Sequence, residues 1–399
     1  MAKYPTIFIH GFFGFGDGDL MNVVMPYWGF RPDRKILPYL KKNGYTEVYN
    51  PALGPFNSSW DRACILYAYL FGGTVDFGKV HSERYGHNRY GETYPGILKD
   101  LGTPGPHAKI NVVGHSFGGP TVLTFVDLMT NGWQEEVDAD PEGCSPLFKG
   151  GKGDLIHTAT TLSGVNNGTL LSDGVNDGER IRLVAGALFV PMVILGDVKA
   201  VRKFWDFQFD QWNIMQKRAE VTGKFKNPLK LKKEIKQFLS VDLDNIGQEM
   251  KVIFAKELND LRGDVNPNTY YFARRAVKSH EIDPVTHKHD MDPHCYPVMS
   301  ALAGKVTGHF INDNLKNNYG VDLATWAPND GFVNLPGQSA PFTQPSVEAA
   351  SFNEDFKPGI WYNMPVEYKD HLSWVGPMED KQETLNYYLD MQKLFESLD

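Results

Sequence analysis

The sequence predicts an α/β fold built on a largely parallel sheet with helices on both faces, and three observations favour this class. Short apolar strand patterns alternate with helix patterns along much of the chain, as in sheets whose parallel strands are joined by helices. One strand pattern runs directly into a G-x-S-x-G turn and then into a helix pattern. The 399 residues are 42% hydrophobic, and α/β enzymes of this length often form one domain with insertions.

The strand and helix patterns follow one another in a regular order. We expect strands over residues 6–9, 46–49, 110–113, 155–163, 268–272 and 359–363. We expect helices over residues 34–43, 59–71, 120–130 and 384–398. The polar stretch 72–96 predicts a loop, and the pattern over 176–262 becomes mostly helical. We therefore expect one domain over residues 1–399, with a loop insertion at 72–96 and a helical insertion at 176–262.

The G-x-S-x-G segment is residues 114–118, with Ser116 at its centre. A serine on a tight strand-to-helix turn is held in the open, and the two glycines let strand and helix pack closely. The amide of the next residue, Phe117, then lies at a helix N-terminus, where it can bind an oxyanion. Gly-rich turns with this spacing also occur by chance, but the flanking strand and helix favour a nucleophile.

Composition and charge narrow the classes of function. The net charge of −8 argues against a nucleic-acid partner, and no apolar run reaches the roughly 18 residues of a membrane span. Aromatic residues make up 13% of the chain, which suits either an apolar substrate or a densely packed core. Three cysteines form no disulfide framework. The first residues carry no signal-peptide pattern, so the sequence leaves export open.

Several longer strings resemble one family over nearly the whole chain. These are residues 10–12 (HGF), 60–64 (WDRAC), 72–78 (GGTVDFG) with His81, 86–87 (GH), 93–96 (TYPG), 267–271 (PNTYY) and 329–334 (NDGFVN). The chain resembles secreted bacterial triacylglycerol lipases of the thermophilic Bacillus/Geobacillus type and, less closely, staphylococcal lipases. The resemblance implies an α/β-hydrolase fold with a helical lid and a zinc site. It also implies an extracellular enzyme that cleaves lipid esters at a lipid–water interface through an acyl-enzyme.

The catalytic triad of this fold occurs in the chain order Ser, Asp or Glu, His. After Ser116, the last histidine is His371, and Asp330 lies in a turn-prone loop before it. Ser116 would attack the ester carbonyl, His371 would move the proton, and Asp330 would hold the imidazole. Asp370 is the alternative acid, although its adjacency to His371 makes their hydrogen bond awkward. The amides of Phe117 and Phe12 would form the oxyanion hole, Phe12 being the position where the family has its second donor.

The resemblance also implies ligands for the zinc ion. Asp61, His81 and His87 match the family strings, and Asp242 aligns with a fourth ligand from the helical insertion, with Asp244 as the alternative. Taken alone, two histidines in a polar loop are more often surface residues. Two imidazoles and two carboxylates suit a closed, four-coordinate structural Zn²⁺.

Two further metal sites have weaker support. The family's calcium ligands after the catalytic histidine fall on Ser373 and Met378, with Glu379 and Asp380 out of register. This disfavours calcium, which stays an open alternative. Histidines and aspartates also crowd the segment 280–294, where a solvated polar loop is favoured over a metal site.

The apolar stretch 180–195 is too short to span a bilayer. It follows a predicted strand and precedes the insertion, where the family has its lid, but an ordinary buried helix explains it as well. The same machinery would serve a carboxylesterase, a phospholipase A1 or a polyester hydrolase. A non-catalytic lipid-binding protein is disfavoured because all three triad residues are present. The oligomeric state cannot be inferred from the sequence.

Overall fold

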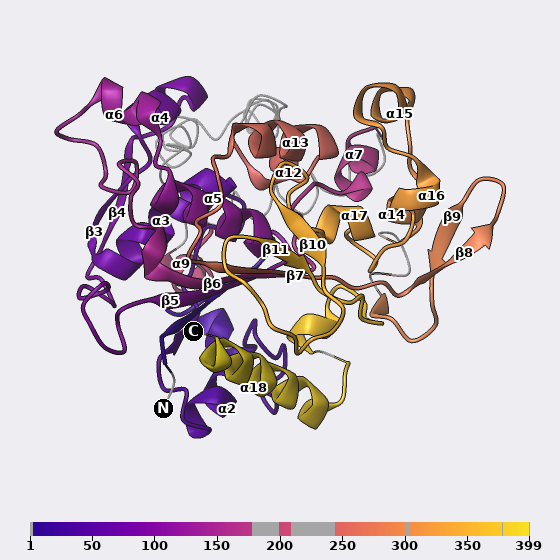
Figure 1. Ribbon diagram of the computed structural model, residues 1–399, viewed down its shortest axis with the longest axis horizontal. Coiled ribbons are helices and arrows are strands. Elements are labelled where there is room, and N and C mark those ends of the chain that lie inside the picture. Colours follow the sequence, from indigo (N-terminus) through magenta and orange to yellow (C-terminus); the bar gives the residue numbers. More distant parts are fainter. Residues whose placement is uncertain are drawn as a thin grey trace.

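The computed structural model describes residues 3–177, 199–208, 244–297, 299, 304–376 and 378–398. At its centre is a seven-stranded sheet in the order β10-β11-β7-β6-β5-β1-β2, with parallel pairing throughout (Figure 1). The strands are β1 (Thr6–Ile9), β2 (Val48–Tyr49), β5 (Ile110–His115), β6 (Ile156–Leu162), β7 (Tyr270–Arg274), β10 (Ser346–Glu348) and β11 (Trp361–Asn363). The predicted α/β class is confirmed, and each predicted strand is present with small shifts at its ends. The short edge strand β10 was missed because it is exposed along its length.

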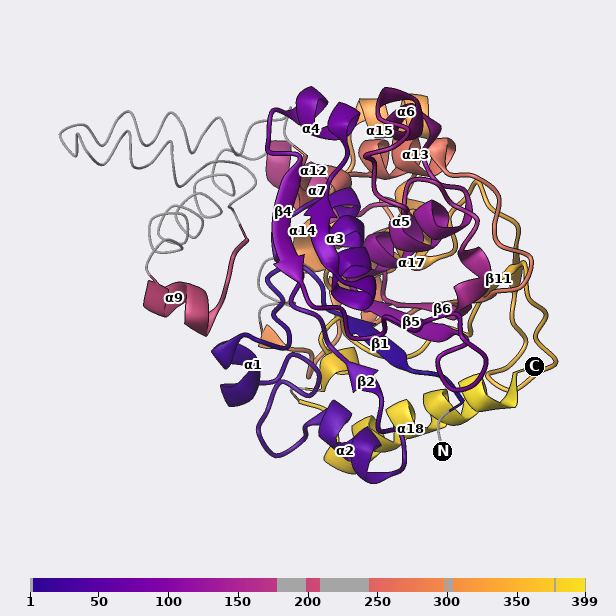
Figure 2. The ribbon, with the colours of Figure 1, turned by 90° about the vertical axis from the view of Figure 1, so that its left-hand side faces the viewer.

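Helices cover both faces of this sheet. Side chains alternate between the faces of a strand, so Ile7 and Ile9 of β1 pack in one core with α3 (Ser59–Phe71) and α5 (Gly118–Thr130). Phe8 points the other way, into a second core with α2 (Ile36–Lys42) and α18 (Lys381–Ser397). Figure 2 shows these two layers above and below the strands. Burial on both faces explains why the central strands are continuous apolar runs.

The remaining described helices lie around the two core layers. They are α1 (Leu20–Val24), α4 (Lys79–Tyr85), α6 (Gln134–Ala139), α7 (Leu170–Asp177), α9 (Lys199–Phe204), α12 (Ile246–Glu249), α13 (Val252–Leu261), α14 (Gly304–His309), α15 (Asp313–Tyr319), α16 (Leu323–Trp326) and α17 (Leu335–Gln338). Single turns of 3₁₀ helix lie at Gly153–Leu155 and Ser373–Val375.

Two segments that we expected to be loops are hairpins. Residues 72–96 contain the antiparallel strands β3 (Gly73–Asp76) and β4 (Tyr90–Tyr94) with α4 between them. The histidine-rich segment forms the antiparallel pair β8 (Ser279–Asp283) and β9 (Lys288–Met291), at the edge of the molecule in Figure 1. Most residues of both hairpins are exposed or half-buried. Their sequences therefore lack the apolar alternation by which a strand is recognised.

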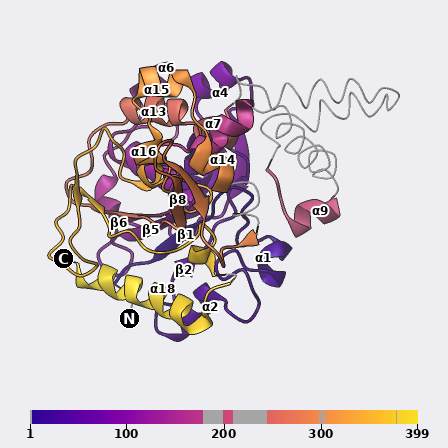
Figure 3. The same ribbon diagram turned by 90° about the vertical axis from the view of Figure 1, so that its right-hand side faces the viewer.

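The described parts of the helical insertion are α9, α12 and α13, whereas the expected lid at 180–195 lies outside the described residues. No helix in the described part of the chain combines the length and hydropathy needed to cross a membrane. The first and last described residues are in contact, since Lys3 Nζ donates a hydrogen bond to Leu398 O at 2.6 Å, in the region near α18 in Figure 3.

Candidate functional site

Ser116 occupies a strained turn between β5 and α5. Its φ is +58°, in the left-handed region that non-glycine residues rarely adopt. A Cβ at Gly114 would lie 2.2 Å from Gly118 O, and a Cβ at Gly118 would lie 2.4 Å from Ile9 O. Only glycine fits at these two positions, so the close packing of β1, β5 and α5 explains the sequence motif.

The backbone around Ser116 is held firmly, and the strain is therefore maintained. The Ser116 amide donates to Leu162 O at 3.0 Å, and Ser116 O accepts from the amides of Gly119 at 2.9 Å and Val165 at 3.2 Å. Phe117 is the N-cap residue of α5. Its amide lies at the positive end of the helix, next to the serine, where negative charge is stabilised.

Asp330 and His371 form a buried pair. His371 Nδ1 lies 2.8 Å from Asp330 Oδ2, and the His371 amide donates to Asp330 O at 2.8 Å. The other carboxylate oxygen, Asp330 Oδ1, accepts from the amides of Phe332 at 3.0 Å and Val333 at 2.8 Å. The carboxylate is thus fixed by the backbone of its own loop and directed at one nitrogen of the imidazole.

Asp370, the alternative acid, faces elsewhere. Its Oδ1 accepts from the amides of Leu372 at 3.1 Å and Ser373 at 3.0 Å, and its Oδ2 accepts from the Tyr296 amide at 2.8 Å. Asp370 therefore organises the loop around His371, and the carboxylate paired with the imidazole is Asp330.

The imidazole of His371 lies beside the nucleophile turn. The ring of His115, the residue before Ser116, has its centroid 4.9 Å from that of His371. His115 Nε2 lies 2.9 Å from His371 O. The structure therefore brings the three predicted triad residues to one end of the central strands.

The loop that follows β1 lies against the nucleophile from the other side. A Cβ at Gly11 would lie 2.6 Å from Ser116 Cβ and 3.0 Å from Ser116 Oγ. Phe12 follows Gly11 directly, and the Phe13 amide then donates to Pro55 O at 3.3 Å. Phe117 thus follows the serine directly, and Phe12 follows the glycine that contacts it; the oxyanion hole formed by their amides stays a prediction.

His10 is buried at the start of this loop and serves as a scaffold. Its Nε2 accepts from the Leu53 amide at 3.1 Å, so the Nδ1 carries the proton and donates to Gly11 O at 3.0 Å. Burial, together with the Arg62 guanidinium, lowers the pKa of His10 to about 3. Arg62 is itself fully buried and donates to His10 O. The contact between Arg62 and His10 joins α3 to the loop after β1, and the spacing of these residues in the sequence gives no indication of it.

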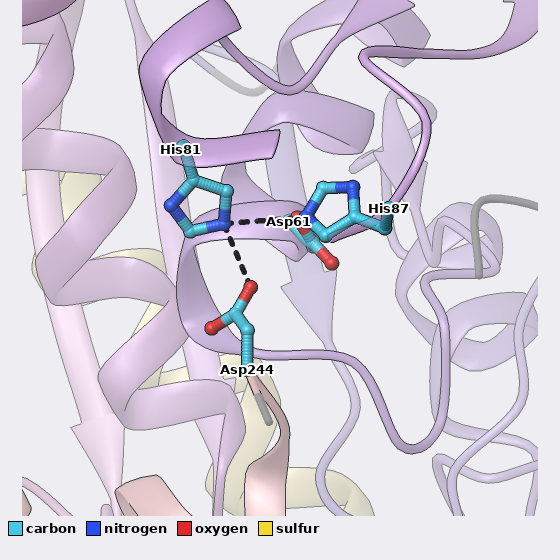
Figure 4. Close-up of side chains that lie close together, drawn as sticks. All are labelled: Asp61, His81, His87 and Asp244. Carbon is cyan, nitrogen blue, oxygen red and sulfur yellow. Dashed lines mark hydrogen bonds and ion pairs between the residues drawn. The ribbon is translucent and has the colours of Figure 1, made fainter. Parts of the chain in front are cut away.

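A second cluster lies between α3, α4 and the segment before α12. Asp61, His81, His87 and Asp244 are all buried, and one ligand atom from each lies within 4.8 Å of the others. Figure 4 shows the four side chains converging on one point. His81 Nε2 lies 2.7 Å from Asp244 Oδ2 and 3.6 Å from Asp61 Oδ1. This is a metal site in its donor types and its burial.

Neighbouring groups orient the ligands of this cluster. His87 Nδ1 lies 2.8 Å from Asn88 O, so it donates there and leaves Nε2 to face the cluster. Ser58 Oγ donates to Asp244 Oδ2 at 2.7 Å. Burial lowers the pKa of His81, but the Asp244 and Asp61 carboxylates outweigh it and raise this pKa to about 9. The surroundings therefore favour positive charge at the point where the ligands meet.

The fourth residue of the cluster is Asp244, which the sequence left as the alternative. The residue that we expected from the resemblance, Asp242, lies outside the described residues. Asn245, directly after Asp244, caps α12 by accepting from the Gly247 amide at 3.0 Å. This cap fixes the position at which the insertion returns to the cluster, two residues from the predicted ligand.

The position of the family's calcium site, which the sequence disfavours, does not fit a calcium ion in the structure either. Arg34 Nη1 donates to the carbonyl oxygens of Gly376 and Glu379, and Ser373 Oγ donates to Glu379 Oε1. A buried guanidinium thus already supplies the positive charge at this loop, and Met378 is exposed.

The charged residues of the histidine-rich hairpin form separate ion pairs. His280 pairs with Asp292 and His287 with Glu281, while His309 of α14 pairs with Asp290. Among the described residues, these groups do not converge on one point.

A parallel sheet, a serine at a strand-to-helix turn and a buried Asp–His pair together define an α/β-hydrolase. The chain belongs to the family described as "Lipase-like, C-terminal domain", whose model matches residues 2–398.

Named relatives agree with this assignment. A lipase of Staphylococcus epidermidis is 32% identical over 401 residues, which cover 99% of this chain and 53% of the relative. Lipase 1 of Staphylococcus aureus is 31% identical over 400 residues, with the same coverage. The chain thus spans about half the length of the curated relatives it matches.

Solved structures match over almost the full chain. The lipase of Staphylococcus hyicus has a TM-score of 0.80 and 29% identity, covering 99% of this chain and 96% of that one. EstA from Clostridium botulinum has a TM-score of 0.77 and 30% identity, with coverages of 99% and 88%. Lipase 1 from Pelosinus fermentans has a TM-score of 0.76 and 29% identity, covering 100% of both chains.

Proposed function

We propose that this chain hydrolyses carboxylic ester bonds of lipids, with triacylglycerols as its principal substrates. One observation carries the proposal: Ser116 stands on a strained turn beside His371, whose Nδ1 lies 2.8 Å from a buried Asp330 carboxylate. Strain at a polar residue of this kind is usual at functional sites.

The reaction follows from these groups in two halves. Ser116 Oγ attacks the ester carbonyl while His371 Nε2 takes its proton and then delivers it to the departing alcohol. A water molecule, activated by the same nitrogen, then releases the fatty acid from Ser116. Asp330 keeps the proton on Nδ1 and stabilises the imidazolium, and the amides of Phe117 and Phe12 bind the oxyanion in both halves.

An apolar substrate fits the surroundings of the nucleophile. Aromatic rings pack on one another along the loop after β1, involving Phe12, Phe13, Phe56, Trp205 and Phe207. Such a wall suits an acyl chain better than a polar acyl group. The relatives named as lipases point to the same substrate class.

The direct test compares the wild type with Ser116→Ala on a series of p-nitrophenyl esters and on emulsified triolein. The wild type should cleave both substrates, and the variant should lose on the order of 10⁶-fold in kcat at an unchanged melting temperature. Cleavage of short esters alone would make the chain a carboxylesterase, and cleavage of phospholipids or polyesters would favour those rivals. Absence of turnover by the wild type would leave a lipid-binding role.

We assign the metal cluster to Zn²⁺. Two imidazoles and two carboxylates in a buried place match a closed zinc site. Bound zinc would supply the charge that joins α3 and α4 to the segment before α12, and it would take no part in the ester chemistry. Its ligands would be Asp61, His81, His87 and Asp244.

Access of substrate through a lid at 180–195 and an extracellular location remain predictions from the resemblance. A lid would cover the cleft with its apolar face in water and turn that face to a lipid surface. The variant with both Phe189→Ser and Ile194→Ser should then lose activity on emulsified triolein and keep activity on short soluble esters. A parallel loss on both substrates would exclude the lid.

A further inference from the structure

A buried chain of hydrogen bonds links the loop after β1 to the histidine of the triad. The Gly11 amide donates to Tyr27 Oη at 2.8 Å, and Tyr27 Oη lies 2.7 Å from His115 Nδ1. His115 Nε2 lies 2.9 Å from His371 O. Tyr27 is only 5% exposed and His115 only 1%, so water does not compete for these groups.

Only one arrangement of protons satisfies every contact in this chain. The Gly11 amide can only donate, so Tyr27 Oη accepts this hydrogen bond. The Tyr27 hydroxyl in turn donates a hydrogen bond to His115 Nδ1. His115 then carries its proton on Nε2 and donates to the carbonyl of His371. Burial, with the nearby His371 adding to it, holds the pKa of His115 well below its usual range, which agrees with a neutral ring that accepts on one side and donates on the other.

The two ends of this chain of hydrogen bonds, Gly11 and His371, belong to the proposed catalytic machinery. Gly11 directly precedes Phe12, whose amide is the second oxyanion donor, and His371 is the general base. Two other polar contacts at the start of this loop involve carbonyl groups, since His10 donates to Gly11 O and Arg62 donates to His10 O. Tyr27 is thus the side chain that ties the Gly11 amide to the region of His371.

We propose that Tyr27, acting through His115, is a positioning residue for ester hydrolysis, an inference that rests on the proposed function. Tyr27 sets the loop that carries the Phe12 amide at a fixed place relative to His371, so that the oxyanion hole and the base match the same tetrahedral intermediate. A small misplacement of such groups costs rate rather than substrate binding.

The test compares Tyr27→Phe with a matched control, Tyr271→Phe. Tyr271 of β7 is 2% exposed, and its Oη accepts from the Asn266 amide at 2.9 Å, so it too loses a buried bond to the backbone. Both variants should show a lower melting temperature. Only Tyr27→Phe should show a kcat about 10- to 100-fold lower with KM nearly unchanged, measured on p-nitrophenyl butyrate well below either melting temperature.

A second measurement separates positioning from loss of stability. A boronic acid that forms a tetrahedral adduct with Ser116 should bind Tyr27→Phe more weakly by about the same factor as kcat falls, and Tyr271→Phe as tightly as the wild type. His115→Gln should behave like Tyr27→Phe. The kcat of the double variant should be no lower than that of the more impaired single variant, because both substitutions interrupt the same chain of hydrogen bonds.

The outcomes distinguish this inference from the proposed function. If the wild type cleaves the ester but Tyr27→Phe matches Tyr271→Phe in kcat and in boronic-acid affinity, the positioning role is overturned. If the effects of Tyr27→Phe and His115→Gln multiply in the double variant, the two residues act separately and the chain is not a unit. A wild type without turnover would instead overturn the proposed function.

Discussion

The catalytic centre and the metal cluster are assembled in opposite ways. The first is built where the central strands end: Gly11 follows β1, and Ser116 follows β5. The second takes no residue from the central sheet and joins α3, α4, the loop after α4 and the segment before α12. The ends of the central strands position the catalytic residues through backbone geometry, whereas the cluster brings together side chains from segments that lie far apart in sequence.

This difference predicts a division of labour. The strained turn at Ser116 is held by backbone hydrogen bonds to β6, to α5 and to the loop after β6, so its geometry does not depend on a metal. The cluster instead gathers two carboxylates in a buried place, which is costly unless a cation is present. Chemistry should therefore depend on the first region and resistance to unfolding on the second.

Of the effects that test this comparison, the largest separates the two aspartates near His371. Asp330→Asn should lower kcat by about 10⁴-fold, because an amide cannot hold the productive tautomer of the imidazole. Asp370→Asn should keep most of the activity and lower the melting temperature, since this carboxylate binds three backbone amides of its surroundings. Steady-state kinetics and thermal melts check both, and the reverse pattern would assign the triad to Asp370.

The next effect concerns the metal ligands. Asp244→Ala should abolish stoichiometric zinc, whereas Asp242→Ala should retain about one zinc per chain, because the cluster uses the former residue. Elemental analysis of the two purified variants, side by side, decides between them. If only Asp242→Ala lost its zinc, the fourth ligand would be Asp242, as the resemblance implies, and Asp244 would be excluded.

A smaller effect is expected from pH. In the metal-free protein, His81 has a pKa of about 9, above the 6.5 of an unfolded chain, so its pairing stabilises the fold fully below pH 6.5 and is lost as pH rises towards 9. Zinc displaces that proton and therefore binds more tightly as pH rises. The difference in melting temperature between zinc-loaded and chelated protein should widen over this pH range. A constant difference would show that His81 does not bind the metal.

The fold and the turn at Ser116 could be predicted from the sequence because their signals are local. The two glycines around Ser116 are required by contacts with neighbouring backbone, so the motif itself encodes the turn. The hairpins β3–β4 and β8–β9 were missed because exposed strands need no apolar alternation. Asp242 and Asp244 could not be separated, since a shift of two residues in a loop depends on the cap at Asn245. Tyr27 and His115 meet only through tertiary structure, and nothing in their spacing indicates it.

The most direct test of this division of labour is chelation of the wild type, with kcat on a short soluble ester and melting temperature measured on the same sample. We predict that removing zinc lowers the melting temperature by several degrees or more and leaves kcat at modest temperature close to that of the loaded enzyme. A kcat that falls in proportion to the zinc removed, well below the melting temperature, would contradict the account and place the metal in the chemistry.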